Sequence, residues 1–100
     1  MKVRVLYWKD AKWGKVSTDN LPALWDIKRD YVPVYDGKML HVTPDKLHAI
    51  LNTIPRDFIG ELPPGVQHYM MSTGDIIELD GECHVKLPSG WTFPEGYWPG

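Results

Sequence analysis

The sequence predicts an α+β fold with a largely antiparallel sheet and two short helices. Three observations support this prediction. The expected elements follow in the order strand, helix, two strands, helix and then further strands; two Asp-Gly dipeptides separate β-prone runs; and no strand–helix–strand unit repeats. The chain has 100 residues, of which 43% are hydrophobic and 24% charged. These values are typical of one globular domain, so we expect residues 1–100 to form a single α+β domain.

The first strand is expected over residues 2–8. Charged and apolar residues alternate there, and the alternation places Val3, Val5 and Tyr7 on one face. A turn over residues 10–14 should follow, because it contains Gly14.

An amphipathic helix should begin near Asn20, a good N-cap residue, and end near Asp30. Pro22 lies in its first turn, where the missing N–H costs nothing. One face of this helix is expected to carry Leu21, Leu24, Trp25 and Lys28.

A hairpin is expected next, with strands at residues 31–35 and 38–42. The intervening Asp36-Gly37 tolerates the positive φ angles of a type I′ turn. Pro33 cannot donate a backbone hydrogen bond, so its strand should lie at a sheet edge.

The strongest helix signal begins at Thr43, which is expected to be the N-cap before Pro44 at the first helical position. Asp45 complements the positive end of the helix dipole, and Pro55 should end the helix. An apolar stripe at helical spacing comprises Leu47, Ile50, Leu51 and Ile54.

The second half of the chain predicts a loop and then several strands. Residues 56–65 are rich in Pro and Gly and should form the loop, and residues 66–71 should form a strand. A second hairpin is expected from residues 76–79 and 83–87 around Asp80-Gly81. Residues 91–93 should add a short strand, and these C-terminal strands could curl into a partial barrel.

Composition and charge exclude several classes of function. A formal net charge of −2 and a pI near 6.0 provide no broad positive field for nucleic acid. The N-terminal residues lack the apolar core of a signal peptide, and no stretch is apolar enough to span a bilayer. With one cysteine the chain cannot form an internal disulfide. We therefore expect a protein of the cytoplasm, in a bacterial or phage-infected host cell.

The residues form no recognisable catalytic or metal-binding pattern, so we expect no catalytic residue, metal or cofactor. The four histidines lack the spacing of zinc ligands, and Cys83 has no basic neighbour that would activate its thiol. His68, Asp75 and Glu78 are the only residues that could be nominated for an enzyme. They would have to converge in a concave pocket.

Aromatic residues crowd the C-terminus, and this suggests a protein-binding surface, because Trp and Tyr are enriched at binding hot spots. The alternative is that the tail folds back to cover an open end of the sheet. The partner-binding candidates are Trp91, Phe93, Tyr97 and Trp98.

The segment Met71-Ser72-Thr73-Gly74-Asp75-Ile76-Ile77, followed by Gly90-Trp91, resembles the YodL-like domain. The resemblance covers residues 43–93. The chain departs from the family pattern at Met70 and at Cys83-His84-Val85. The resemblance implies a protein of phages, plasmids or integrated elements, and it carries over no activity and no catalytic residues.

The four residues Ser72, Thr73, Gly74 and Asp75 also have a structural interpretation that does not depend on the family. Gly74 should supply an unusual φ, Asp75 should bond to the backbone two residues on, and the two hydroxyls should lock the strand entry. This interpretation makes the segment a folding device.

The leading functional hypothesis is a non-catalytic accessory protein of a phage or mobile element that binds another protein, with a host defence or replication component as the candidate partner. The alternative is a small-ligand or nucleotide-binding domain, with a pocket between the sheet and the helix that starts at Thr43. The sequence leaves the oligomeric state open.

Overall fold

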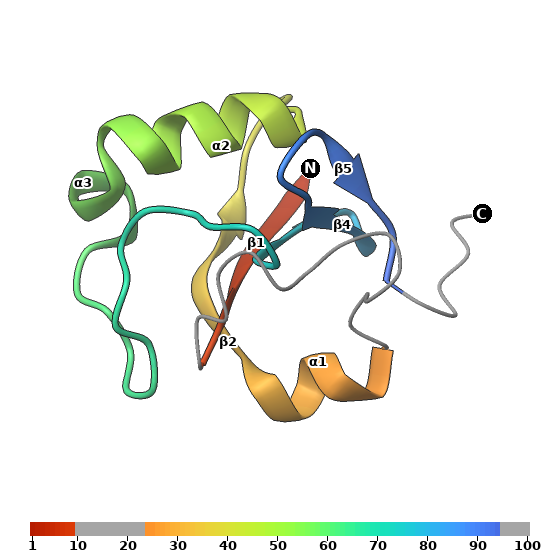
Figure 1. Ribbon diagram of the computed structural model, residues 1–100. Helices are drawn as coiled ribbons and strands as arrows, with labels where there is room; N and C mark the ends of the chain where they lie inside the picture. Colours follow the sequence, from red (N-terminus) through yellow and green to blue (C-terminus); the bar gives the residue numbers. More distant parts are fainter. Residues whose placement is uncertain (10–23, 95–100) are drawn as a thin grey trace.

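The structure is a computed structural model that describes residues 1–9 and 24–94, except for the side chains of residues 24–26 (Figure 1). Within these ranges the elements are β1 (Lys2–Trp8), α1 (Leu24–Asp30), β2 (Tyr31–Lys38), α2 (Pro44–Thr53), α3 (Pro55–Ile59), β3 (Ile76–Leu79), β4 (Glu82–Lys86) and β5 (Trp91–Thr92). The strands form one antiparallel sheet in the order β2-β1-β3-β4-β5. The α+β prediction is confirmed. The described residues contain three helices where two were predicted, and the sheet is open rather than curled into a barrel.

The predicted first strand is confirmed as β1, and it lies at the centre of the sheet between β2 and β3. Successive side chains of β1 point to opposite faces of the sheet, and each face contributes to a separate hydrophobic core. Val3, Val5 and Tyr7 are fully buried in the larger core, and Leu6 belongs to the smaller core on the other face. Because β1 pairs with β2 and with β3, the registers of these two pairings decide which side chains of β2 and β3 lie on each face.

The predicted hairpin around Asp36-Gly37 is wrong, because β2 runs straight through this dipeptide. Asp36 pairs with Arg4 of β1, and Gly37 pairs with Val3. A turn at this point would leave the first half of β1 without a partner on that side, so the long pairing outweighs the local turn preference. The prediction of an edge position for Pro33 is confirmed, since β2 is an edge strand; the register shifts between Val5 and Leu6, beside Pro33.

The predicted helix after Thr43 is confirmed as α2. The Thr43 hydroxyl accepts a hydrogen bond from the Lys46 amide at 3.2 Å, and Leu47 and Leu51 are buried in the larger core. Pro55 ends α2 as predicted. It also begins α3, a five-residue helix where the sequence predicted loop, because proline fits the first turn of a helix as well as it ends one.

The predicted strand at residues 66–71 is wrong. Both sides of β1 are already taken by β2 and β3, and the segment crosses the face of the sheet as irregular chain. Val66, His68 and Met71 are buried against this face, so the apolar character of Val66 and Met71 reflects packing and not strand pairing. The carbonyl of Tyr69 accepts its hydrogen bond from the Tyr7 hydroxyl at 2.8 Å.

The second predicted hairpin is confirmed as β3 and β4. Asp80 and Gly81 have φ angles of 48° and 87°, the positive values that a type I′ turn requires. The last predicted strand is present as the two-residue β5.

The first helix, α1, begins at Leu24, and its predicted start at Asn20 and Pro22 lies outside the described residues, as does the turn at residues 10–14. The side chains of Leu24 and Trp25 on its predicted apolar face are also outside them. Ile27 packs on the smaller core, so α1 and α2 cover different faces of the sheet (Figure 1). No helix among the described residues has the length and apolar character to cross a membrane.

Candidate functional site

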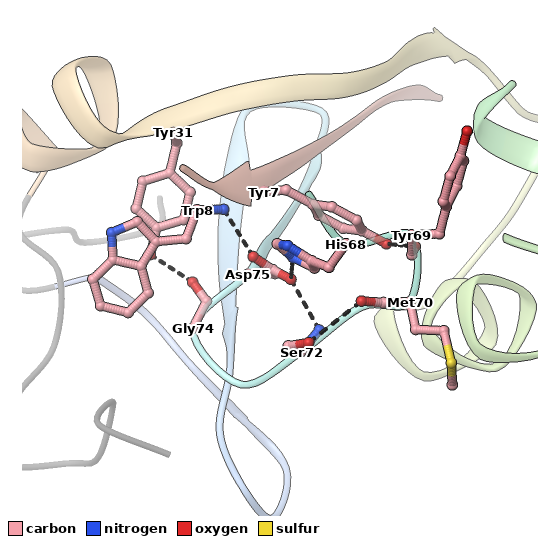
Figure 2. A network of polar contacts seen from close by, with 9 residues as sticks. All are labelled: Tyr7, Trp8, Tyr31, His68, Tyr69, Met70, Ser72, Gly74 and Asp75. Atoms are coloured by element: carbon pink, nitrogen blue, oxygen red, sulfur yellow. Dashed lines mark hydrogen bonds and ion pairs between the residues drawn. The ribbon is translucent and has the colours of Figure 1, made fainter. Parts of the chain in front are cut away.

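The carboxylate of Asp75 joins three separate parts of the chain (Figure 2). Oδ1 accepts a hydrogen bond from the backbone N–H of Trp8, at the end of β1, at 2.8 Å. Oδ2 accepts one from the backbone N–H of Ser72 at 2.9 Å and lies 2.8 Å from Nε2 of His68. Because a carboxylate can only accept, Nε2 of His68 is the donor in this pair. The side chain of Asp75 is 1% exposed, so these bonds compensate the burial of its charge.

Gly74 extends this network to β2 and β4. Its φ of 96° lies outside the range that other residues adopt readily. Its N–H donates to the Lys86 carbonyl at 2.7 Å, and its own carbonyl accepts from the Tyr31 hydroxyl. The residues that enter β3 are therefore attached to three of the other strands.

His68 is held by stacking as well as by hydrogen bonding. Its ring lies parallel to that of Tyr7, with a centroid distance of 4.6 Å and an interplanar angle of 9°. Burial, followed by the charge of Asp75, raises the pKa of Tyr7 above its ordinary value, so its hydroxyl stays protonated and donates to Tyr69. Sequence reasoning missed Tyr7, Trp8 and Tyr31 as partners of the Ser72–Asp75 segment, because all three lie far from it in the chain.

The details of this segment differ from the prediction. Asp75 bonds to the Ser72 amide three residues before it, and the predicted bond to the backbone two residues on does not form. The Ser72 hydroxyl donates to the Met70 carbonyl at 3.3 Å. The aspartate lies at the end of the turn: its carbonyl accepts from the Lys86 N–H, and its side chain reaches back to the Ser72 amide.

The three residues nominated for an enzyme do not converge. His68 and Asp75 meet, but Glu78 lies on the other face of the sheet, 3.6 Å from the guanidinium of Arg4. His68 and Asp75 are 9% and 1% exposed, which leaves little access for a substrate. Burial raises the pKa of Asp75 above its ordinary value, and the hydrogen bonds from His68, Trp8 and Ser72 offset part of this rise.

Cys83 is buried. Burial and the nearby Glu78 raise the pKa of its thiol to about 12, and the thiol donates to Glu78 at 3.6 Å. Within residues 1–9 and 24–94, no group of three His, Cys, Asp or Glu side chains could hold a metal ion.

The C-terminal aromatics divide into two described and two undescribed residues. Trp91 is half-buried against the larger core, and its Nε1 donates to Asp45 of α2 at 2.7 Å. Phe93 is also half-buried, with its ring 5.6 Å from that of His84. Tyr97 and Trp98 lie outside the described residues. Trp91 therefore fastens β5 to α2.

A different surface exposes large apolar side chains next to an aromatic ring. Ile54 and Met70 are 48% and 52% exposed, and the guanidinium of Arg56 lies 4.4 Å from the ring centroid of Tyr69. The side chains of Tyr69 and Met70 point away from Asp75 in Figure 2. We call Ile54, Arg56, Tyr69 and Met70 the corner patch, because they join the α2–α3 corner to the loop that precedes β3.

A pocket lies on the face of the sheet that α1 covers, on the side opposite α2. The location predicted from the sequence, between the sheet and the helix that starts at Thr43, stays a prediction; on that side Leu47, Leu51, Val3 and Val5 are buried in the larger core. The pocket has a volume of about 560 Å³.

Comparisons with models of protein families, with curated protein sequences and with solved structures found no match to this chain.

Proposed function

We propose that this protein is a non-catalytic accessory protein that binds another protein through the corner patch. The observation that carries the proposal is the exposure of Ile54 and Met70, which are close in sequence to Arg56 and Tyr69, the two residues that join the α2–α3 corner to the loop before β3. Arginine and tyrosine are enriched at binding hot spots, and methionine adapts to irregular apolar surfaces. A fitting partner presents apolar side chains around a carboxylate that pairs with Arg56.

The use of the buried polar groups supports a binding role over catalysis. The oxygens of Asp75 bind groups that hold the loop to β1, and His68 is stacked and buried. The thiol of Cys83, with a pKa of about 12, is protonated at neutral pH. The resemblance of residues 43–93 to the YodL-like domain supports a setting in a phage or mobile element. In that setting the protein would act in the cytoplasm on a host defence or replication component.

Affinity capture from bacterial lysate with quantitative mass spectrometry tests the proposal. The wild type is compared with Met70→Glu, which places a charge in the corner patch. Leu40→Glu is the matched control, because Leu40 is fully exposed in the loop after β2. We expect a protein that the wild type and the control both recover and that Met70→Glu loses.

The interaction is then measured with the purified partner. Met70→Glu should weaken binding about ten-fold or more, the effect of losing about 1.4 kcal/mol. Trp98→Ala tests the surface that the sequence first suggested. If Trp98→Ala abolishes capture and Met70→Glu leaves it intact, the corner patch is the wrong surface; if no recovered protein depends on either residue, the proposed function is wrong.

A further inference from the structure

The pocket beneath α1 has a floor made by part of a row of paired residues that runs across four strands. In the register of the sheet, Asp36 of β2 pairs with Arg4 of β1, Arg4 pairs with Glu78 of β3, and Glu78 pairs with Cys83 of β4. Direct partners on neighbouring strands point to the same face. Arg4, Glu78 and Cys83 all line the pocket, so this row gives it a polar floor.

The guanidinium of Arg4 has hydrogen-bonding capacity that the fold does not use. It lies 3.7 Å from a carboxylate oxygen of Asp36 and 3.6 Å from one of Glu78, which is beyond good hydrogen-bond distance. Its Nε is buried and has no hydrogen-bond partner among the described residues. One third of the side chain is exposed. A guanidinium presents five donors in a planar fork that matches a carboxylate.

The remaining charges of the pocket have opposite signs. Lys28 of α1 also lines the pocket and adds a second positive charge to it. Glu78 provides a carboxylate that is 19% exposed. Cys83 is uncharged at neutral pH, because burial raises the pKa of its thiol. The pocket therefore offers donors for an anionic group and one carboxylate for a cationic group.

The other walls are apolar. Leu6 pairs with Pro33 across β1 and β2, one step along the strands from the polar row, and both line the pocket. Ile27 of α1 and the ring of Tyr31 complete this side. Pockets for small molecules have volumes of about 300–1,000 Å³ and combine mostly apolar walls with a few placed polar groups. This pocket, at about 560 Å³, has both properties.

We propose that the pocket binds a small zwitterion with an apolar body, of the chemical class of apolar and aromatic α-amino acids. The carboxylate of the ligand binds Arg4 and Lys28, its ammonium group binds Glu78, and its side chain packs on Leu6, Ile27 and Tyr31. This assignment uses both signs of charge in the pocket. A ligand with only an anionic group would leave Glu78 facing the bound anion.

Four probes separate the parts of this recognition: L-phenylalanine, N-acetyl-L-phenylalanine, L-phenylalaninamide and L-alanine. The second lacks the ammonium group, the third lacks the carboxylate, and the fourth lacks the apolar body. Binding is followed by chemical-shift changes in amide NMR spectra of the full chain. We expect L-phenylalanine to shift resonances of β1, β3 and α1, and each altered probe to bind about ten-fold more weakly, because each loses an interaction of about 1.4 kcal/mol or more.

Two variants test the residues. Arg4→Gln and Lys28→Gln should each weaken binding of L-phenylalanine, and Lys46→Gln, an exposed change on α2, should not. Arg4→Gln leaves two carboxylates close together and could disturb the sheet, whereas Lys28 is exposed and its replacement keeps the fold. The proposal is overturned if L-phenylalanine does not bind, if the four probes bind alike, or if the shifts fall on α2 and α3.

Discussion

Asp75 shows how a single buried carboxylate holds together segments that are distant in sequence. It connects the end of β1, the turn at Ser72 and the ring of His68, and its own backbone bonds to Lys86 of β4. Such a group is costly to bury, and it is stable only because donors surround it.

Replacing Asp75 by alanine should lower the free energy of unfolding by about 3 kcal/mol or more, since several buried donors lose their acceptor at once. Urea denaturation monitored by circular dichroism measures this loss. Glu61→Ala is the matched control, because Glu61 is exposed on a loop and its removal should cost less than about 0.5 kcal/mol. A loss at Asp75 no larger than that of the control would show that the network does not stabilise the fold.

The protonation of Asp75 provides a second prediction. Burial raises its pKa in the folded state, so between the unfolded value of about 3.9 and the folded value the native protein binds more protons than the unfolded chain. The contribution of this group to stability is therefore complete below the unfolded pKa and decreases as pH rises through the folded pKa. A carbon NMR titration of the Asp75 carboxyl group should give a midpoint above 3.9; a midpoint below it would contradict the stated balance between burial and hydrogen bonding.

Among the elements, the two Asp-Gly dipeptides differ in conformation although their local sequences are equivalent. Asp80-Gly81 forms the tight turn between β3 and β4, and Asp36-Gly37 lies inside β2. Strands β3 and β4 are short and adjacent in sequence, so their pairing requires the turn. β2 instead has a full-length partner in β1, and the strand continues.

This difference predicts that replacing each of the two glycines by alanine lowers the free energy of unfolding by a different amount. Gly81→Ala should lower the free energy of unfolding by about 1–2 kcal/mol, because an L-residue at φ 87° is strained even with open space around it. Gly37→Ala should cost less, since Gly37 has no positive φ and its new Cβ would meet mainly the hydroxyl end of Tyr35. Thermal unfolding of the two variants checks this order, and equal losses would argue against a distinct turn at Gly81.

On the scale of the whole molecule, the two proposed sites lie on opposite faces of one sheet. The corner patch belongs to the side of the larger core, and the zwitterion pocket lies on the side of the smaller core beneath α1. Sites without shared residues normally contribute independently. The Asp75 network lies at the end of β1, and the row of Arg4, Glu78 and Cys83 lies on the face of the sheet that α1 covers.

Independence of the two faces is the last prediction. Met70→Glu should leave the affinity for L-phenylalanine unchanged within about two-fold, and Lys28→Gln should leave capture of the protein partner unchanged. Titration of each variant with L-phenylalanine, alongside the capture experiment, measures both. A loss of ligand affinity in Met70→Glu would mean that the two faces are coupled through the sheet.

The sequence by itself determined the elements whose local sequence preferences agree with the tertiary contacts around them. The alternation in β1, the Thr43 cap and proline boundaries of α2, and the Asp80-Gly81 turn all depend on residues a few positions apart. Local geometry is sufficient there because the local preference and the tertiary structure favour the same conformation.

Only the tertiary structure decided the rest. The pairing of β2 with β1 overrode the turn signal at Asp36-Gly37. Both sides of β1 are paired with β2 and β3, so residues 66–71 have no place beside it in the sheet. The Asp75 network joins Trp8 to a residue 67 positions away, and the polar row of Arg4 and Glu78 depends on the register of separate strands. Such contacts form when distant segments meet, and no pattern within one segment contains that information.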